Sequence, residues 1–189
     1  SIYNESKDNS WLKNGAQFDF SNFDKERSRV SNNFRNSGVY YFSRDYIRFE
    51  NDTIGKDKQV DVKMTVANRI IRRGDSLSQR AFKVYKIKNV NVFTDASFEN
   101  FSQLSPKKTA TFNDFNFYNF KKLKYKPQSI ANVVQIAKGN LYSDLDKTRT
   151  YRYLNALNSF KYPNIEYLEN PQDTSLTAVS HTHLRAHET

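Results

Sequence analysis

Two pairs of neighbouring carboxylates are the first residues in this chain that could do chemistry. Asp24 and Glu26 form one pair, and Asp144 and Asp146 form the other. Two close carboxyl groups can act as general acid and general base when their environments separate their pKa values. Both pairs fall where a helix is predicted to begin, and carboxylates there favour the helix dipole and its exposed N–H groups. We therefore interpret both pairs as helix-start residues.

Three histidines lie near the end of the chain, at His181, His183 and His187. Imidazole is the commonest metal ligand, but a metal site needs ligands that are fixed by rigid elements and by further hydrogen bonds. No rigid element is predicted here, so we interpret residues 180–189 as an added or disordered tail and not as a metal site.

The sequence carries none of the motifs that assemble a catalytic site. It has no Gly-x-Ser-x-Gly, no Walker-type glycine loop and no His-Glu-x-x-His. It also has no cysteine, which excludes disulfides and thiolate metal ligands. We predict a protein that is not an enzyme and that uses neither a cofactor nor a metal ion.

Basic residues exceed acidic ones, 30 Lys and Arg against 20 Asp and Glu, which gives a formal net charge of +10. Such a charge suits nucleic acid, anionic lipid or acidic proteins without choosing between them. The densest basic cluster follows an aromatic stretch, so a module that stacks single-stranded nucleic acid is one alternative. No nucleic-acid reader motif accompanies the charge, and we interpret the lysines as a solvated face and the aromatics as packing residues. The residues concerned are Lys121, Lys122, Lys124, Lys126, Phe112, Phe115, Phe117, Tyr118 and Phe120.

An internal repeat indicates the elements that position these residues. Residues 21–40 and 143–162 carry identical residues at one constant spacing, which chance explains poorly. In each copy a serine can cap a helix, and an aspartate follows three residues later as in a capping box. The identical pairs are Ser21/Ser143, Asp24/Asp146, Lys25/Lys147, Arg27/Arg149, Asn33/Asn155, Asn36/Asn158, Ser37/Ser159 and Tyr40/Tyr162.

Each copy predicts one helix followed by two strands. Gly38 ends the first helix, and the second ends near Phe160, before Pro163. The predicted buried face of the helices consists of Phe23, Val30, Phe34, Leu145, Leu154 and Leu157. The predicted strands are 40–49 and 59–66 in the first copy, joined by a hairpin loop, and 164–168 and 175–179 in the second.

Further elements precede each copy. A helix is predicted over 127–139, with proline at its start and glycine at its end, and strands over 82–94 and 111–120. The first copy would need a first strand within or before residues 1–6 and a short helix around 10–13. Residues 71–81 form the predicted junction between the two modules.

The order β-α-α-β-β, repeated in tandem, resembles the polypeptide-transport-associated (POTRA) domains of BamA/TamA-like outer-membrane proteins of the Omp85 superfamily, in a Bacteroidota-like style. The stretches that carry the resemblance are 139–143 with Thr150, Leu154, Leu157 and Phe160, and 18–20 with Arg27 and 34–42. The resemblance implies an α+β fold of two modules, 1–70 and 82–179, the second with an insertion at about 95–120. Each module would be a small three-stranded mixed sheet covered on one face by two helices.

The resemblance also implies a function. Such modules lie in the periplasm, attached to an outer-membrane β-barrel, and bind unfolded outer-membrane proteins and periplasmic or lipoprotein assembly partners. If the last strand of each sheet is central, the strand before it is an edge, and an edge strand can pair with an extended client. The predicted partner-binding residues are Arg44, Tyr46, Ile47, Arg48, Phe49, Glu50, Asn164, Ile165, Glu166 and Tyr167. Plain edge strands blunted by Arg48, Glu50 and Glu166 are the alternative.

Two expectations concern the rest of the protein. The sequence has no apolar run long enough for a membrane helix and no signal peptide, and its abrupt start predicts a fragment of a longer protein tethered through a C-terminal barrel. A cell-division or adhesion module of similar topology is a further alternative, since topology does not specify function.

Overall fold

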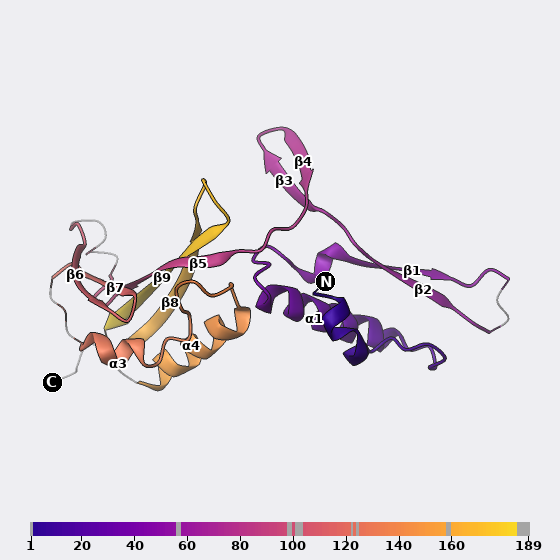
Figure 1. The fold of residues 1–189 in the computed structure, drawn as a ribbon, viewed down its shortest axis with the longest axis horizontal. Helices are drawn as coiled ribbons and strands as arrows, with labels where there is room; N and C mark the ends of the chain where they lie inside the picture. The colour runs from indigo at the N-terminus through magenta and orange to yellow at the C-terminus, as the bar shows by residue number, and fades with distance from the viewer. Residues whose placement is uncertain are drawn as a thin grey trace. The chain divides into compact units, whose positions relative to one another are not determined.

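The computed structural model describes residues 2–55, 58–97, 100, 104–121, 123, 125–157 and 160–184. The chain divides into two compact units, Ser1–Val84 and Tyr85–Thr189. Each unit combines helices with a small sheet (Figure 1), and the predicted α+β class is confirmed. Among the described residues, no helix is long and apolar enough to cross a bilayer.

The first unit packs one long helix against a two-stranded antiparallel sheet. Its sheet pairs β1 with β2 in a register that runs from Ile47 opposite Val66 to Asp52 opposite Asp61. A second antiparallel pair, β3 with β4, follows. The elements of the unit are η1 (Asn4–Asn9), α1 (Phe20–Asn36), η2 (Arg44–Tyr46), β1 (Ile47–Asp52), β2 (Asp61–Val66), β3 (Arg69–Arg73) and β4 (Ser76–Arg80).

The core of the first unit lies between α1 and β1. Its buried members are Val30, Val39, Phe42 and Ile47. Phe34 of α1 stacks on Phe42 with ring centroids 4.6 Å apart. Aromatic rings therefore supply much of the apolar area that holds this small unit together.

The helix α1 begins earlier than its sequence predicted. Asp19 is the N-cap, and its carboxylate accepts from the N–H of Ser21 at 2.8 Å and from its hydroxyl at 2.9 Å. The expectation that Ser21 caps the helix is therefore wrong. At the other end Gly38 has φ 95°, a left-handed conformation that favours glycine, and the N–H of Val39 returns to the C=O of Phe34. The predicted stop at Gly38 is confirmed.

Three further expectations for the first unit differ from the structure. Residues 4–9 form a 3₁₀-helix where a first strand was expected, and no helix forms at 10–13. The sheet accordingly has two strands in place of three. Residues 71–81, the expected junction, fall largely within the β3–β4 hairpin.

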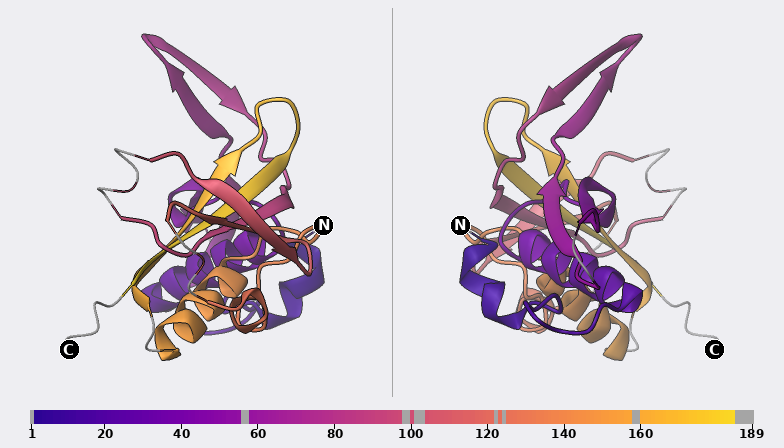
Figure 2. Two further views of the ribbon diagram at one scale, coloured as in Figure 1. Left: turned by 90° about the vertical axis from the view of Figure 1, so that its left-hand side faces the viewer. Right: turned by 90° about the vertical axis from the view of Figure 1, so that its right-hand side faces the viewer.

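The second unit is built on a five-stranded mixed sheet in the order β6-β7-β5-β9-β8. β5 runs parallel to both β7 and β9, whereas β6 and β8 pair antiparallel with their neighbours. Both helices lie on the same side of the sheet in Figures 1 and 2. The elements are β5 (Lys86–Phe93), β6 (Lys107–Phe112), β7 (Phe115–Asn119), α3 (Pro127–Ala131), α4 (Asp144–Ala156), β8 (Phe160–Glu169) and β9 (Ser175–Leu184).

The helices of the second unit follow the sequence prediction in part. Ser143 caps α4 and accepts from the N–H of Asp146 at 3.2 Å, as predicted. Leu154 is fully buried, but Leu145 and Leu157 are exposed, so the predicted apolar face was wrong at both ends. The predicted helix 127–139 is confirmed only over Pro127–Ala131, because the chain leaves the helical conformation after Ala131.

The insertion at about 95–120 adds two strands to the sheet. The stretch expected as one strand, 111–120, contains a turn at Asn113 and Asp114, which both have positive φ as a type I′ hairpin turn requires. The extra strands β6 and β7 join the sheet on the far side of β5 from β9. This is why the sheet has five strands and not the expected three.

The central strand β9 continues through Leu184. Ser180 is buried, and the ring of His181 lies 5.1 Å from that of Phe93. The expectation of disorder over residues 180–184 was therefore wrong. Residues 185–189 lie outside the described part of the chain.

Candidate functional site

Two strands of the chain lie at sheet edges and follow the capped helices. In the second unit β9 lies between β5 and β8, so the last strand is central and β8 is an edge. In the first unit β1 pairs with β2 alone among the described residues. An edge strand presents backbone N–H and C=O groups to any extended chain that can align with it. These two edges form the candidate site.

The structure places most of the predicted site residues of the first unit in β1. Ile47, Arg48, Phe49 and Glu50 belong to the strand. Arg44 and Tyr46 do not: they form the 3₁₀ turn η2, which the N–H of Tyr46 closes on the C=O of Ser43 at 3.3 Å. The expectation that the edge strand includes Arg44 and Tyr46 was therefore wrong.

The hydrogen bonds before β1 show which backbone groups of the strand face outward. The C=O of Tyr46 accepts from the N–H of Ala67 at 2.8 Å, so Tyr46 faces β2. Backbone groups alternate in direction along an antiparallel strand, so Arg48 and Glu50 also face β2. The backbone groups of Ile47, Phe49 and Asn51 consequently point to the open edge.

A side chain of α1 already covers the first of these groups. The Nε of Arg27 donates to the C=O of Ile47 at 3.3 Å, and its guanidinium lies 5.0 Å from the ring centroid of Phe49. Asp24 pairs with both Arg27 and Arg44, at 3.2 and 3.4 Å. An open depression of about 450 Å³ lies beside the start of β1, lined by Asp24, Arg27, Arg44, Asp45 and Ile47.

The edge strand β8 is covered at a matching place. The N–H of Ile165 donates to the hydroxyl of Tyr151, a residue of α4, at 2.8 Å, and that hydroxyl contacts Oδ1 of Asn164 at 3.1 Å. Asn164 in turn donates to Glu166 at 2.6 Å. Proline also lies in this strand, at Pro163, where it removes one donor, as is common in edge strands.

In both units, therefore, a helix side chain hydrogen-bonds the outward backbone of an isoleucine in the edge strand. Arg27 does so from α1, and Tyr151 does so from α4. Each contact narrows the part of the edge that a partner strand could reach. In β1 the hydrogen bond from Arg27 involves the backbone of Ile47 and not the outward backbone groups of Phe49 and Asn51.

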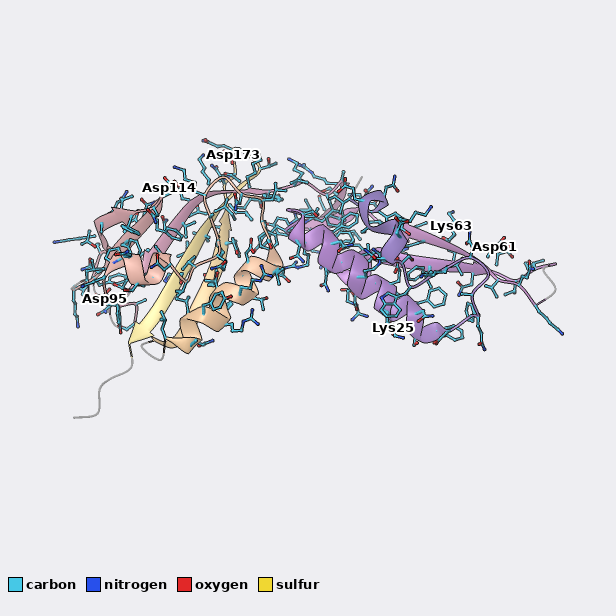
Figure 3. The ribbon with its side chains drawn as sticks, turned by 60° about the horizontal axis from the view of Figure 1, so that its bottom comes forward. Lys25, Asp61, Lys63, Asp95, Asp114 and Asp173 are labelled. Carbon is cyan, nitrogen blue, oxygen red and sulfur yellow. The ribbon has the colours of Figure 1, made fainter. Side chains whose placement is uncertain are left out.

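The side chains of the two strands divide into buried and exposed sets. Ile47 and Ile165 are 3% and 2% exposed, and Tyr167 packs edge-on against Tyr142 at 5.0 Å. These side chains hold the strands to the helices and cannot contact a partner directly. The exposed members are Arg48, Glu50, Asn164 and Glu166. Glu50 pairs across the hairpin with Lys63 at 3.5 Å, and Lys63 is labelled on β2 in Figure 3.

The residues suspected of catalysis have structural roles. Glu26 is fully buried, and it accepts from the hydroxyl of Ser10 at 3.0 Å, the N–H of Trp11 at 2.9 Å and the guanidinium of Arg29 at 2.6 Å. Burial alone raises the pKa of Glu26, but these hydrogen bonds outweigh it and leave the pKa below its ordinary value. Glu26 is thus a charged anchor for residues 6–11.

The sequence interpretation missed the buried state of Glu26. A glutamate and an arginine three residues apart on a helix are usually a solvated surface pair, so the types alone give no signal. The contacts of Ser10 and Trp11 with Glu26 are equally hard to predict, because these residues lie 16 and 15 positions from Glu26 in the chain.

The other residues that could do chemistry lie in structural positions or outside the described part of the chain. Asp144 accepts from the hydroxyl of Tyr142 at 2.8 Å, at the start of α4. Within the described ranges, no group of three or more His, Cys, Asp or Glu side chains could hold a metal ion. His187, Lys122 and Lys124 lie outside the described residues. The aromatics Phe115, Phe117 and Phe120 are buried and therefore cannot stack on a base.

Comparisons with known proteins inform the fold. No protein-family model and no curated protein matches the chain. Among solved structures, the chain is similar to the crystal structure of BamA from Haemophilus ducreyi lacking POTRA domains 1-3, with a TM-score of 0.62 and 8% sequence identity. The match covers 98% of this chain and 27% of that chain, so the chain spans about a quarter of its length.

Two further solved structures match less well. One is the N-terminal domain of Omp85 from Thermosynechococcus elongatus, with a TM-score of 0.33, 6% identity and coverage of 96% of this chain and 92% of that one. The other is POTRA3-5 of Haemophilus influenzae BamA, with a TM-score of 0.31, 9% identity and coverage of 89% and 83%. The likeness to the first BamA chain shows that this chain shares a known fold, which is the one that the sequence resemblance implied.

Proposed function

We propose that the chain is a periplasmic protein-binding scaffold of an outer-membrane β-barrel assembly protein, and that it binds extended segments of client polypeptides along β1. The observation that carries the proposal is the open edge of β1 in a two-stranded sheet. The fold similarity to BamA supports the cellular setting. A scaffold needs no catalytic group, which fits the structural roles of the carboxylates.

The proposed contact is the addition of a strand. A client segment beside β1 would pair with the outward backbone groups of Phe49 and Asn51, because β-augmentation gains its affinity from main-chain hydrogen bonds. Each backbone hydrogen bond contributes about 1 kcal/mol net in water. A contact with so few bonds is weak and reversible, which suits a scaffold that must release its clients.

β8 is the second proposed edge. Its exposed Asn164 and Glu166 flank the place where Tyr151 bonds the strand. A client there must displace the Tyr151 hydroxyl from the N–H of Ile165, so we expect β8 to bind more weakly than β1. Accessory subunits of the assembly machinery are alternative partners for the same edge.

The proposal is tested by blocking one outward N–H of β1. Asn51→Pro removes that donor without removing a β1–β2 ladder bond, since the N–H of Asn51 faces the open edge and proline is tolerated in edge strands. Asn51→Ala is the matched control, because it keeps the N–H. A photocrosslinker at the exposed Arg48 would report binding of a urea-denatured outer-membrane barrel polypeptide diluted into buffer with the purified chain.

We expect Asn51→Pro to weaken crosslinking about five-fold, from the loss of one hydrogen bond of about 1 kcal/mol, and Asn51→Ala to leave it unchanged. A crosslinker at the exposed Arg149 on α4 should stay silent throughout. Equal crosslinking in the proline and alanine variants, with the fold intact, would show that β1 does not bind clients through its edge.

A further inference from the structure

The β3–β4 hairpin is a short segment rich in arginine. Residues 69–80 contain four arginines, Arg69, Arg72, Arg73 and Arg80, against one acid, Asp75. They contain no lysine, although lysine is the commoner basic residue in the chain as a whole. Arginine binds phosphate and carboxylate groups in a bidentate manner that lysine does not match. The composition therefore points to an oxyanion ligand.

The hairpin also exposes aliphatic side chains. Ile70 is 56% exposed and Leu77 is 64% exposed. The register pairs Ile70 with Gln79 and Arg72 with Leu77, and residues paired across strands or two apart share a face. Ile70, Leu77 and Arg72 consequently lie on one face of the hairpin, which combines apolar side chains with a cation.

The hairpin stands apart as a two-stranded ribbon (Figures 1 and 2). β3 and β4 pair only with each other among the described residues, and every residue of β4 is exposed. A lone two-stranded hairpin is marginally stable in water. Arg69 and Arg80 also lie directly opposite each other, and like charges in that position destabilise a pair of strands.

We propose that this hairpin binds the surface of an anionic phospholipid bilayer. Arg72, which shares the face of Ile70 and Leu77, would contact lipid phosphates, and Ile70 and Leu77 would enter the boundary between headgroups and acyl chains. Basic charge combined with exposed apolar side chains is the pair of signals that holds a protein at such an interface. The depression beside the start of β1, and a second open one lined by Trp11, Asp24, Lys25, Ser28, Arg29 and Arg44, both lie outside the hairpin. The hairpin therefore offers a surface for binding.

A bilayer fits these observations better than an acidic polypeptide. Ile70 and Leu77 need an apolar layer, and Arg72 on the same face needs anions at the border of that layer. A headgroup region offers both over an extended plane. The inference goes beyond client binding, and it places the chain next to a membrane only if the chain is anchored there, as the proposed function holds.

The experiment is sedimentation of the full chain with vesicles of phosphatidylethanolamine and phosphatidylglycerol, and with vesicles of phosphatidylcholine alone. Arg72→Gln removes the cation on the apolar face, and Ile70→Ser with Leu77→Ser removes the two aliphatic side chains. The matched control is Lys107→Gln, which removes equal charge from an exposed position of β6. Circular dichroism, which reports both units, verifies that each variant is folded.

We expect Arg72→Gln to bind anionic vesicles about five-fold more weakly, from the roughly 1 kcal/mol that a basic residue contributes near an anionic surface. The serine variant should lose at least ten-fold. The lysine control should change little, and phosphatidylcholine vesicles should bind poorly. Wild-type binding by both hairpin variants, or binding of polyglutamate in place of vesicles, would overturn the proposal.

The result of the vesicle experiment does not depend on client binding. The vesicle experiment contains no client, and the crosslinking experiment at Arg48 contains no lipid. Failure of one therefore leaves the other intact.

Discussion

Removal of the Glu26 carboxylate tests how the first unit is held together. Glu26 is fully buried and bonds Ser10, Trp11 and Arg29, while the Arg29 side chain is only 11% exposed. Removing one partner of a buried ion pair leaves the other charge uncompensated, at a cost of about 3–5 kcal/mol. Arg29 keeps contacts with Ser6 at 2.8 and 2.9 Å, so we place Glu26→Ala at the low end, about 3 kcal/mol.

The assay can observe the first unit alone. Trp11 is the single tryptophan of the chain, and its backbone N–H donates to the carboxylate of Glu26. Urea unfolding followed by tryptophan fluorescence therefore reports the unit that the substitution perturbs, whereas circular dichroism reports both units. Glu50→Ala is the control, because its exposed ion pair with Lys63 should contribute about 0.5 kcal/mol or less.

The pH dependence gives the sign of the effect. The folded pKa of Glu26 lies below its ordinary value of 4.5, so the ionised carboxylate stabilises the fold fully above that value and loses its contribution as the pH falls through the folded pKa. The stability difference between wild type and Glu26→Gln should therefore shrink as the pH is lowered from 7 toward 3. A difference that stays constant over this range, or an unchanged midpoint for Glu26→Ala, would refute the assignment of Glu26 as a charged anchor.

Two further predictions concern the second unit. Leu154→Ala should destabilise it by about 2–5 kcal/mol because Leu154 is fully buried, whereas Leu157→Ala, at a position 37% exposed, should cost under about 1 kcal/mol; urea unfolding followed by circular dichroism compares them. Tyr151→Phe removes the hydroxyl that bonds Ile165, so we expect client crosslinking from Glu166 to increase several-fold and hydrogen exchange at the N–H of Ile165 to accelerate. Unchanged exchange at Ile165 would contradict the coverage of β8 by Tyr151.

The repeat was the part of the sequence that predicted most of the fold. Its signals are local: the Ser143 cap, the glycine stop at Gly38 and the strand that follows each helix depend on residues within one or two turns. Local hydrogen bonds decide where a helix begins and ends, so sequence spacing carries the information. Even here the choice between Asp19 and Ser21 as the first cap could not be made, because both residue types cap well.

The strand count could not be predicted, because pairing depends on contacts between residues distant in the chain. β7 joins the sheet beside β5 across a parallel register that no local pattern specifies. The turn at Asn113 and Asp114 had a sequence signal, since both residues tolerate positive φ, but the aromatic alternation around it favoured one continuous strand. For residues 180–184, the cluster of histidines and the lack of a predicted rigid element suggested a tail. Strand β9 includes them because β5 pairs with Ser180 and His181, and β8 pairs with the strand as far as Leu184.

The candidate site, like the fold, could be predicted from the sequence only in part. Edge position follows from topology, so the sequence resemblance could indicate β1 and β8. The helix side chains that cover these edges could not be inferred from the repeat: Arg27 is matched by Arg149 in the second copy, but Tyr151 makes the equivalent contact there. The two units thus reach the same result, a partly covered edge, through different residues.

The partial coverage of β1 by Arg27 and of β8 by Tyr151 has a physical reason. A fully open edge strand invites uncontrolled pairing with any unfolded chain, which is a hazard for a protein that is surrounded by unfolded clients. A single side-chain hydrogen bond to each edge strand, at its first residue in β1 and in mid-strand in β8, shortens the stretch available for pairing, and a short stretch releases what it binds. If edge coverage tunes client affinity, Arg27→Leu should strengthen client crosslinking at Arg48 while leaving Asn51→Pro able to reduce it. Weaker crosslinking in folded Arg27→Leu would instead show that Arg27 itself contacts the client.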